Sequence, residues 1–558
     1  MATSSAKYRC QECDQGFGKL KSLTRHLKTE GHMVGVEHIQ AKCAQKAVAQ
    51  RPPVDRVACT LSPALTQPKA SESRVSDSDP GVAHRYEDVL AALKPTTANC
   101  FNRDFASISD FLARPMNPAS FKIQRMTLVN DLNCHNLEES AFLGSSVAES
   151  ASRPPIHQNF HLNVHEPFCL VALGVQGAGK SHTMSVVLES CLTPTKHIPG
   201  PDSSLVNING PMCALVLHFD QNPHSLCEST GLISPAGYYV DHLGMKSPLP
   251  SLKRDQMTVL VSPTYYLQRS AFYGSYCTTR PLLFSWKTLS ADHIKKLMRI
   301  NDNENQLYMA TLLDLLRNFQ RSCQKPLFSE FRERVVKLAN VKGQEAPLIQ
   351  RLNLLESFLL ESEKNVTLRD HAVDLGTLIQ AGRLIVVDLT DPMLSASEVN
   401  GVFQLLVEQF RVAPLQGCGK LVAVDEAHKF MDGQSSDGLG DAILDTIRLM
   451  RHDGVRVLLS TQSPRALRPE ILELISVAVL HQFHSRDWFN YLQAKIPLVE
   501  ADFRRIVGLE PGDAVVFAGR HLLESEGGDG MVGVAGATWK MRVRARFTAD
   551  RGASRLSK

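Results

Sequence analysis

Long apolar runs are missing from this chain of 558 residues. No stretch of about 18 or more consecutive apolar residues occurs, so the sequence predicts no transmembrane helix and no membrane partner. The first residues also lack the apolar segment and the small-residue cleavage site of a secretory signal. We therefore expect an intracellular protein, and a nuclear location in preference to a cytoplasmic one.

Cysteine pairs and internal repeats are scarce as well. Of 13 cysteines, only Cys10 and Cys13 have the C-x-x-C spacing. We interpret the others as reduced thiols, most of them small buried apolar residues. No repeat of about 20–50 residues is found.

A strong net charge is also absent, because the formal charge of +4 is too small to indicate nucleic-acid binding by itself. The positive excess lies in residues 1–50, which hold eight Lys or Arg against four Asp or Glu. The hydrophobic content of 43% and the charged content of 21% are those of a globular protein. The length suits one large α/β domain with smaller appendages.

A stretch rich in Pro and Ser divides the chain. Residues 51–81 show neither a helical nor a strand period, and we predict a disordered linker over residues 33–81. Residues 82–154 give a mixed pattern and stay unassigned, as a partly ordered segment. The large domain is predicted over residues 155–548.

Short runs of Val, Leu and Ile alternate with longer helical patterns in this large domain. The alternation predicts an α/β fold with a mostly parallel sheet covered by helices. About residues 289–363 are helical throughout, which we interpret as a helical insertion. The predicted strands are 168–174, 214–220, 257–262, 383–389, 420–426, 455–461 and 477–483.

Two cysteines and two histidines near the N-terminus have the spacing of a tetrahedral Zn²⁺ site, C-x2-C-x12-H-x5-H. Phe17 and Leu23 fall where C2H2 fingers place their two small-core apolar residues. We predict a small ββα zinc finger over residues 8–32. Its ligands are Cys10, Cys13, His26 and His32.

The partner of this finger is open between nucleic acid and protein. If it reads DNA as other C2H2 fingers do, Lys19, Ser22 and Arg25 occupy the base-reading helix positions and cover about three base pairs. Three base pairs are too few to specify a site. The five-residue gap between the histidines also resembles fingers that bind structured RNA or other proteins.

A Walker A motif, GVQGAGKS, follows an apolar run and precedes a helical pattern. Its glycines let consecutive backbone N–H groups wrap phosphates, and the following helix adds its positive N-terminal end. Lys180 is predicted to reach the β- and γ-phosphate oxygens, and the Ser181 hydroxyl to bind Mg²⁺. The predicted phosphate-binding residues are Gly174, Gly177, Ala178, Gly179, Lys180 and Ser181.

A second acidic motif, KLVAVDEAHKF, has the Walker B arrangement. Asp425 is predicted to hold Mg²⁺, and Glu426 to polarise the attacking water. Paired acids at a strand end usually form only a solvated turn, but these follow a buried-looking strand. One helix later, Gln462 ends the strand VRVLLST, where it could sense the γ-phosphate or align the water, or simply lead into a loop.

The order GVQGAGKS, LIVVDL, VAVDEAHKF, LLSTQSPRALRPEILE and VLHQF resembles the HerA/FtsK superfamily of P-loop ATPases, closest to HerA. The resemblance covers about residues 155–548. It implies an ATP-hydrolysing, ring-forming and usually hexameric homo-oligomer that moves DNA or protein through its centre. By position, it assigns the catalytic roles to Lys180, Ser181, Asp425, Glu426 and Gln462.

The chain departs from that family at the expected trans-acting arginine finger. Gln482 stands at the position where the family commonly has Arg. Arg486, Arg451 and Arg448 are the remaining candidates, each against the alternative of an ordinary surface arginine. The zinc finger and linker also occupy the place of the N-terminal barrel of archaeal HerA proteins.

The segment WKMRVRARFT alternates strictly near the C-terminus. Lys540, Arg542, Arg544 and Arg546 would share one face of a strand. That face is either an ordinary solvated face or a basic strip, with Arg542 and Arg544 contacting nucleic acid.

Two functions fit these motifs. The first is an ATP-driven translocase or remodelling motor on DNA or RNA, targeted by the finger. The second is a slow nucleotide-dependent switch or scaffold whose finger binds a protein. Both require ATP, Mg²⁺ and Zn²⁺.

Overall fold

The structure is a computed structural model that describes residues 8–9, 16–17, 125–150, 153–196, 204–236, 249–298, 307–322, 325–338, 345–415, 417–433, 438–520, 523–524, 531–532 and 538–551. The chain divides into two compact units, Met1–Asn99 and Cys100–Lys558. Each unit is described by itself below.

The described part of the first unit is an antiparallel pair of short strands, β1 (Tyr8–Arg9) and β2 (Gly16–Phe17), in which Tyr8 lies opposite Phe17. The pair occupies the place of the two strands that a ββα finger requires. The predicted zinc ligands Cys10, Cys13, His26 and His32 lie outside the described residues, as do Lys19, Arg25 and the predicted linker.

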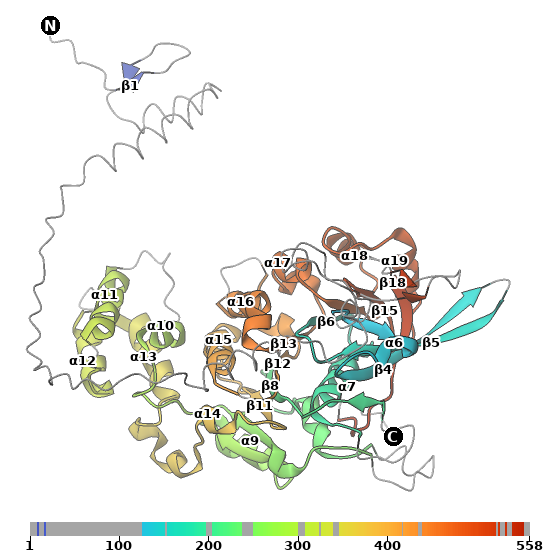
Figure 1. The fold of residues 1–558 in the computed structure, drawn as a ribbon. Helices are drawn as coiled ribbons and strands as arrows, with labels where there is room; N and C mark the ends of the chain where they lie inside the picture. Colours follow the sequence, from blue (N-terminus) through green and yellow to red (C-terminus); the bar gives the residue numbers. More distant parts are fainter. Residues whose placement is uncertain are drawn as a thin grey trace, which may run out of the picture. The chain divides into compact units, whose positions relative to one another are not determined.

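The second unit is built on one mixed sheet of 14 strands (Figure 1). Its strands are β3 (Leu128–Asn130), β4 (Ser140–Ser150), β5 (Arg153–Asn163), β6 (Cys169–Leu173), β7 (Val206–Asn207), β8 (Cys213–His218), β9 (Met257–Val261), β10 (Thr278–Pro281), β11 (Leu384–Asp388), β12 (Lys420–Val424), β13 (Val455–Thr461), β14 (Val477–Leu480), β15 (Asp513–Ala518) and β18 (Thr538–Val543). The order is β10-β9-β11-β8-β12-β13-β6-β14-β15-β18-β4-β5-β3, and β7 pairs with β4. A separate pair, β16 (Leu523–Glu524) and β17 (Met531–Val532), is antiparallel.

All seven predicted strands are confirmed, and with β10 they form the parallel part of the sheet, from β10 to β14. Every residue of β6, β8, β11, β12 and β13 is buried. Strands covered on both faces consist of continuous apolar runs, which is why the sequence reveals them.

The sheet begins earlier than predicted, so the boundary at residue 155 is wrong. β3, β4 and β5 lie before or across it, and they pair antiparallel with one another beyond β18. β4 reads SAFLGSSVAES, with polar residues between the apolar ones. Strands of this kind carry no long apolar run, so residues 82–154 gave no clear signal.

Helices cover both faces of the sheet. Leu170 of β6 packs in the same core as Val186 of α7 (Lys180–Leu192) and Tyr266 of α9 (Tyr266–Tyr273). Val171 packs into the opposite core, with helices α15 (Ala396–Val412) and α16 (Gly438–Asp453). The remaining covering elements are α6 (Asp131–Cys134), α14 (Leu375–Leu378), α17 (Pro469–Glu473), α18 (Arg486–Gln493), α19 (Glu500–Val507) and the 3-10 helices η2 (Glu228–Ile233), η3 (Arg254–Gln256), η4 (Pro263–Tyr265), η6 (Ala427–Lys429) and η7 (Pro464–Ala466).

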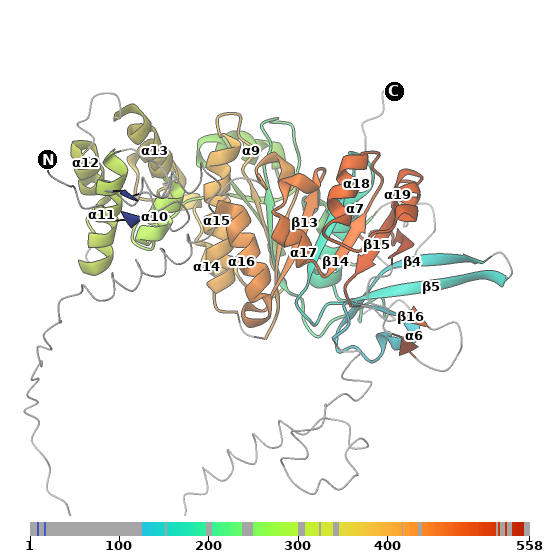
Figure 2. The ribbon, with the colours of Figure 1, turned by 90° about the horizontal axis from the view of Figure 1, so that it is seen from above.

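The predicted helical insertion is confirmed. It consists of α10 (Ala291–Leu297), α11 (Leu307–Ser322), α12 (Phe328–Leu338), α13 (Glu345–Ser357) and η5 (Glu363–His371). Figure 2 shows these helices gathered at one end of the sheet, beyond α14 and α15. Across the described ranges, no helix has both the length and the apolar character that a membrane crossing needs.

Candidate nucleotide-binding and catalytic site

The loop after β6 has the shape of a phosphate-binding loop. Gly177 and Gly179 have φ angles of 77° and 112°, which side-chain-bearing residues rarely adopt. A Cβ on Gly174 would lie 2.8 Å from the Cβ of His481, so glycine allows the loop to approach β14 closely. Because α7 begins at Lys180, its positive N-terminal end faces the loop.

The Lys180 side chain lies over this loop. Lys180 is only 5% exposed, and its Nζ donates a hydrogen bond to the carbonyl oxygen of Val175 at 2.9 Å. Burial lowers the pKa of Lys180, while three nearby carboxylates oppose that shift. They belong to Glu426, Asp425 and Glu228.

Asp425 directly follows β12, and only β13 separates β12 from β6. Asp425 is 3% exposed, and its Oδ1 has no hydrogen-bond partner among the described residues. A buried carboxylate oxygen without a partner is costly unless a cation or water satisfies it. Asp425 therefore fits the predicted role of a Mg²⁺ ligand, since Mg²⁺ prefers carboxylate oxygen.

Glu426 is held by two neighbours. Gln462, just beyond β13, donates from Nε2 to Glu426 Oε1 at 3.1 Å. The Lys429 ammonium forms an ion pair with the Glu426 carboxylate and also donates to Asp220 Oδ2 at 2.7 Å. The structure thus places Gln462 beside the proposed water-activating acid, although its catalytic role stays a prediction.

The site contains a third acid that the motifs did not reveal. Glu228, the first residue of η2, lies beside Ser181, whose side chain favours the charged form of the carboxyl and so opposes a rise in its pKa. Burial and the neighbouring charge of Asp425 raise the pKa of Glu228 to about 7. No motif marks Glu228, because only the packing of η2 against α7 brings it to Ser181.

His481 supports the loop from the end of β14. Its Nε2 lies 2.9 Å from Thr183 Oγ1 and its Nδ1 lies 3.0 Å from the carbonyl oxygen of Asp513. Burial lowers the pKa of His481 to about 4, so the ring is neutral near neutral pH. The carbonyl oxygen of Gln482 also accepts a hydrogen bond from the Val175 N–H at 2.9 Å.

These residues form one site at the carboxyl ends of adjacent parallel strands. The loop glycines leave space for phosphates, Lys180 supplies a positive charge, and Asp425 supplies a buried carboxylate oxygen without a hydrogen-bond partner among the described residues. The residues present therefore fit a nucleotide with its divalent cation. Strand order, loop and helix together are those of a P-loop NTPase fold.

The arginine-finger candidates lie on the surface of the chain. Arg486 is engaged by Glu500 through two hydrogen bonds of 2.6 Å. Arg448 and Arg451 are exposed on α16, and Arg448 lies 3.7 Å from Asp445. A finger acts on the site of a neighbouring subunit, so these roles stay predictions.

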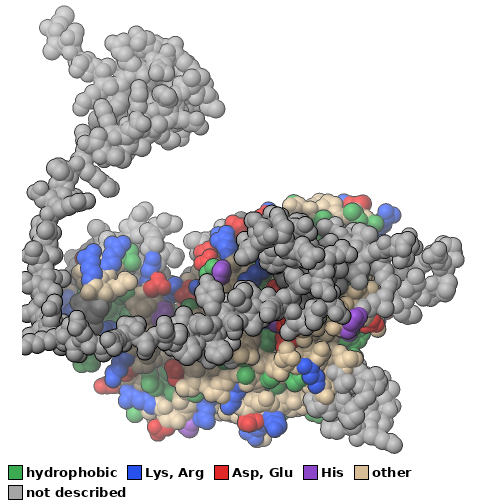
Figure 3. All heavy atoms as spheres, viewed as in Figure 1, with side chains coloured by type: hydrophobic (Ala, Val, Ile, Leu, Met, Phe, Trp, Pro, Cys, Tyr) green, Lys and Arg blue, Asp and Glu red, His purple; other side chains and the backbone are tan. Residues whose placement is uncertain are grey.

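The predicted basic face near the C-terminus is wrong for Arg544 and Arg546. β18 ends at Val543, and beyond it the alternation inverts, so that both arginines are buried. Arg544 Nη1 donates to Glu189 Oε2 of α7 at 2.8 Å. Arg542 is exposed, but it pairs with Asp513 at 2.6 Å. On the face seen in Figure 3, basic and acidic side chains are interspersed over the described surface.

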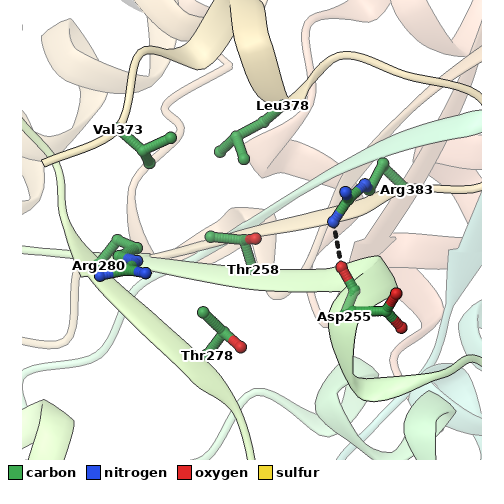
Figure 4. A pocket seen from close by; sticks show the side chains of 7 residues that line it. All are labelled: Asp255, Thr258, Thr278, Arg280, Val373, Leu378 and Arg383. Atoms are coloured by element: carbon green, nitrogen blue, oxygen red, sulfur yellow. Dashed lines mark hydrogen bonds between the residues drawn. The ribbon is translucent and has the colours of Figure 1, made fainter. Parts of the chain in front are cut away.

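A cavity of about 290 Å³ lies elsewhere in the sheet (Figure 4). Thr258 is near the start of β9, Thr278 starts β10, and Arg383 immediately precedes β11. The cavity therefore opens at the amino ends of these strands, at the edge opposite the phosphate-binding loop. It is lined by Asp255, Thr258, Thr278, Arg280, Val373, Leu378 and Arg383.

No protein-family model matches the chain, and no curated protein sequence matches it. Solved structures with a similar arrangement include VirB4 of Thermoanaerobacter pseudethanolicus, at 12% identity over 73% of this chain and 96% of the other, with a TM-score of 0.41. B204, the DNA-packaging ATPase from Sulfolobus turreted icosahedral virus, shows 13% identity over 47% of this chain and 92% of its own, with a TM-score of 0.20. The cytoplasmic domain of the Thermomonospora curvata type VII secretion ATPase EccC shows 9% identity over 73% and 29%, with a TM-score of 0.25.

Proposed function

We propose that this chain is a Mg²⁺-dependent ATPase. One observation carries the proposal: Lys180, Asp425, Glu426 and Gln462 converge from the ends of β6, β12 and β13 around a glycine-rich loop. Three of them have the chemistry that phosphoryl transfer to water requires: Lys180 is a cation for the phosphates, Asp425 an oxygen ligand for Mg²⁺ and Glu426 a carboxylate for the nucleophile.

The residues would divide the reaction as follows. The backbone N–H groups of the loop and Lys180 would bind the β- and γ-phosphates. The Ser181 hydroxyl and Asp425 would hold Mg²⁺, which would supply positive charge to the phosphate oxygens. The Glu426 carboxylate would accept a hydrogen bond from the attacking water and thereby orient the water. The Gln462 amide fixes the Glu426 carboxylate, with which it already shares a hydrogen bond of 3.1 Å.

Glu426 must exchange its ion pair with Lys429 for the attacking water before hydrolysis. Lys429 has a second acceptor in Asp220, which lies 2.7 Å from its ammonium group. The lysine can therefore stay paired when Glu426 turns toward the nucleotide. This exchange gives the site a resting arrangement and an active one.

We further propose that the ATPase works as a homo-oligomer, a hexamer by its resemblance to HerA/FtsK proteins, and that it acts as a motor on DNA or RNA inside the cell, in the nucleus. A Zn²⁺ finger over residues 8–32 would target it. The second candidate is a slow switch or scaffold whose finger binds a protein.

ATP turnover by the purified chain tests the proposal. We expect Lys180→Ala to abolish productive binding of ATP, and Glu426→Gln to retain binding while turnover falls by about 100-fold. Wild-type turnover in Glu426→Gln would contradict the assignment. Turnover with DNA, with RNA and with neither separates the two candidates, since only a motor is stimulated by its track.

A further inference from the structure

Three side chains that could hold a metal ion lie together at Asp425, the predicted Mg²⁺ ligand. His218 ends β8, Cys227 immediately precedes η2, and Asp425 follows β12, so three separate segments contribute. One donor atom of each lies within 4.8 Å of the other two, and all three residues are buried. Exposed acids often cluster without a metal, but a closed set of nitrogen, sulfur and oxygen donors is more specific.

The contacts inside this group are incomplete. His218 Nδ1 pairs with Asp425 Oδ2 at 3.4 Å, a contact that is long for a hydrogen bond. Asp425 Oδ1 has no hydrogen-bond partner within the described residues. Buried polar atoms are nearly always satisfied, so the free oxygen of Asp425 beside an imidazole and a thiol leaves a place where a cation can bind.

The surrounding charge favours a cation. Asp388, at the end of β11, forms an ion pair with Arg269 and accepts a hydrogen bond from the Tyr273 hydroxyl at 2.6 Å. The carboxylates of Asp425 and Asp388 both interact electrostatically with His218 and Cys227, and Lys429 is a nearby cation that opposes them at His218.

We propose that His218, Cys227 and Asp425 bind a borderline-soft divalent transition metal, Zn²⁺ above all, and that this metal inhibits the enzyme by withdrawing Asp425 from Mg²⁺. Thiolate and imidazole ligands select Zn²⁺, whereas Mg²⁺ prefers oxygen alone. On binding, the Cys227 thiol loses its proton to solvent and the sulfur bonds to the metal. The inhibition rests on the proposed ATPase function, but the binding does not.

Cobalt(II) tests the binding, because a thiolate ligand gives it a charge-transfer absorption band. The experiment uses the full chain carrying Cys10→Ser and Cys13→Ser, so that the predicted finger contributes no thiolate. We expect a band equivalent to one sulfur ligand. Absence of any thiolate band in this chain would overturn the proposal, whatever the further variants do.

A matched control assigns the band. Among the described residues one other group, Asp131, Cys134 and His161, could also hold a metal. Adding Cys227→Ser should remove the band, and adding Cys134→Ser should leave it. If Cys134→Ser removes the band and Cys227→Ser leaves it, the metal is bound by the group that contains Cys134, and the proposal is wrong. If Cys227→Ser fails to fold, His218→Gln serves in its place, with a band at least tenfold weaker at equal cobalt as the expected result.

Zn²⁺ inhibition of ATP turnover tests the consequence. We expect inhibition at fixed Mg²⁺ that a chelator reverses, and Cys227→Ser should need at least about tenfold more Zn²⁺. Equal sensitivity of wild type and Cys227→Ser would refute the inhibitory role. A cobalt band without any ATP turnover would instead show that the metal site exists and that the proposed ATPase function is wrong.

Discussion

Glu426 has a φ of 49°, and it is the sole non-glycine residue with positive φ in the described part of the chain. Such a conformation costs about 1–3 kcal/mol and persists where surrounding contacts impose it. Here the contacts are the hydrogen bond from Gln462 and the ion pair with Lys429. The strain positions the carboxylate beside Gln462, which argues for a functional constraint on this residue.

Gln462 gives the first prediction. Gln462→Ala should lower the rate of ATP turnover by about 10-fold or more while ATP affinity is unchanged, because it loosens Glu426 and leaves the phosphate loop intact. Gln482→Ala is the matched control, since the Gln482 amide donates to the Val507 carbonyl oxygen instead. Steady-state kinetics of both variants check this, and equal rates would exclude a role for the Gln462 amide.

Glu228 gives the second prediction. Its carboxyl group lies beside Ser181 and adds negative charge near Asp425. Glu228→Gln should therefore raise the Mg²⁺ concentration for half-maximal turnover by about 3- to 10-fold. Glu510→Gln, at an exposed acid, should leave the Mg²⁺ titration unchanged. A titration of Glu228→Gln that coincides with wild type would remove Glu228 from the site.

His481 gives a pH prediction. Its pKa falls from about 6.5 to about 4 on folding, so the unfolded state binds more protons between these values. Above pH 6.5 this residue does not lower the free energy of unfolding. As the pH falls from 6.5 toward 4, its protonation in the unfolded state lowers that free energy by roughly 3 kcal/mol at most. The thermal midpoint of His481→Gln should fall less steeply over this range than that of wild type. Parallel slopes would contradict the assignment.

Helix α7 is anchored at its far end by a buried carboxylate. Glu189 accepts hydrogen bonds from Arg544 Nη1 at 2.8 Å, from the backbone N–H groups of Phe547 and Thr548, and from the Thr548 hydroxyl at 2.6 Å. Both charged groups are almost completely buried, with side-chain exposures of 4% for Arg544 and 0% for Glu189. These contacts hold α7, the helix that begins at Lys180, against the C-terminal segment.

Removing one partner of this pair tests the anchor. Glu189→Gln should destabilise the second unit by about 3–5 kcal/mol, because it leaves the buried Arg544 charge uncompensated. Adding Arg544→Met should recover part of that loss. A double-mutant cycle compares the thermal unfolding of Glu189→Gln, of Arg544→Met and of the variant that carries both substitutions. Additive losses would show that the pair is not coupled.

The elements differ in how clearly the sequence predicts them. β6 and β12 are apolar at nearly every position, and β13 contains the apolar run over residues 457–459, so each pattern predicts a buried strand. β4 alternates and pairs at the antiparallel side of the sheet, so its pattern resembled that of a loop. In β18 the alternation is correct up to Val543, and the prediction failed where the chain leaves the strand.

At the scale of the whole molecule, the predicted catalytic residues all belong to the second unit, Cys100–Lys558. Deleting residues 1–99 should therefore leave basal ATP turnover within about twofold of wild type and change only targeting. Turnover and nucleic-acid binding of the truncated chain check this. Loss of turnover in a folded truncated chain would show that the N-terminal unit takes part in catalysis.

The sequence by itself determined the parallel strands, the phosphate loop and the Walker B acids. These features are local in sequence. The loop motif GVQGAGKS spans eight consecutive residues, and a buried strand is predicted by its own apolar run. The backbone geometry that they need follows from neighbours in sequence, chiefly the glycines at 177 and 179.

Only the tertiary structure decided that Glu228 meets Ser181, that His481 packs against Thr183 and that Arg544 is buried on Glu189. The partners in the last pair are 355 residues apart. A periodic pattern states which residues share a face of one element, but it does not state which element covers that face. Burial and ion pairing depend on which element covers the face. The sequence pattern therefore predicts Arg544 as a solvated strand residue, whereas in the fold it forms a buried ion pair with Glu189.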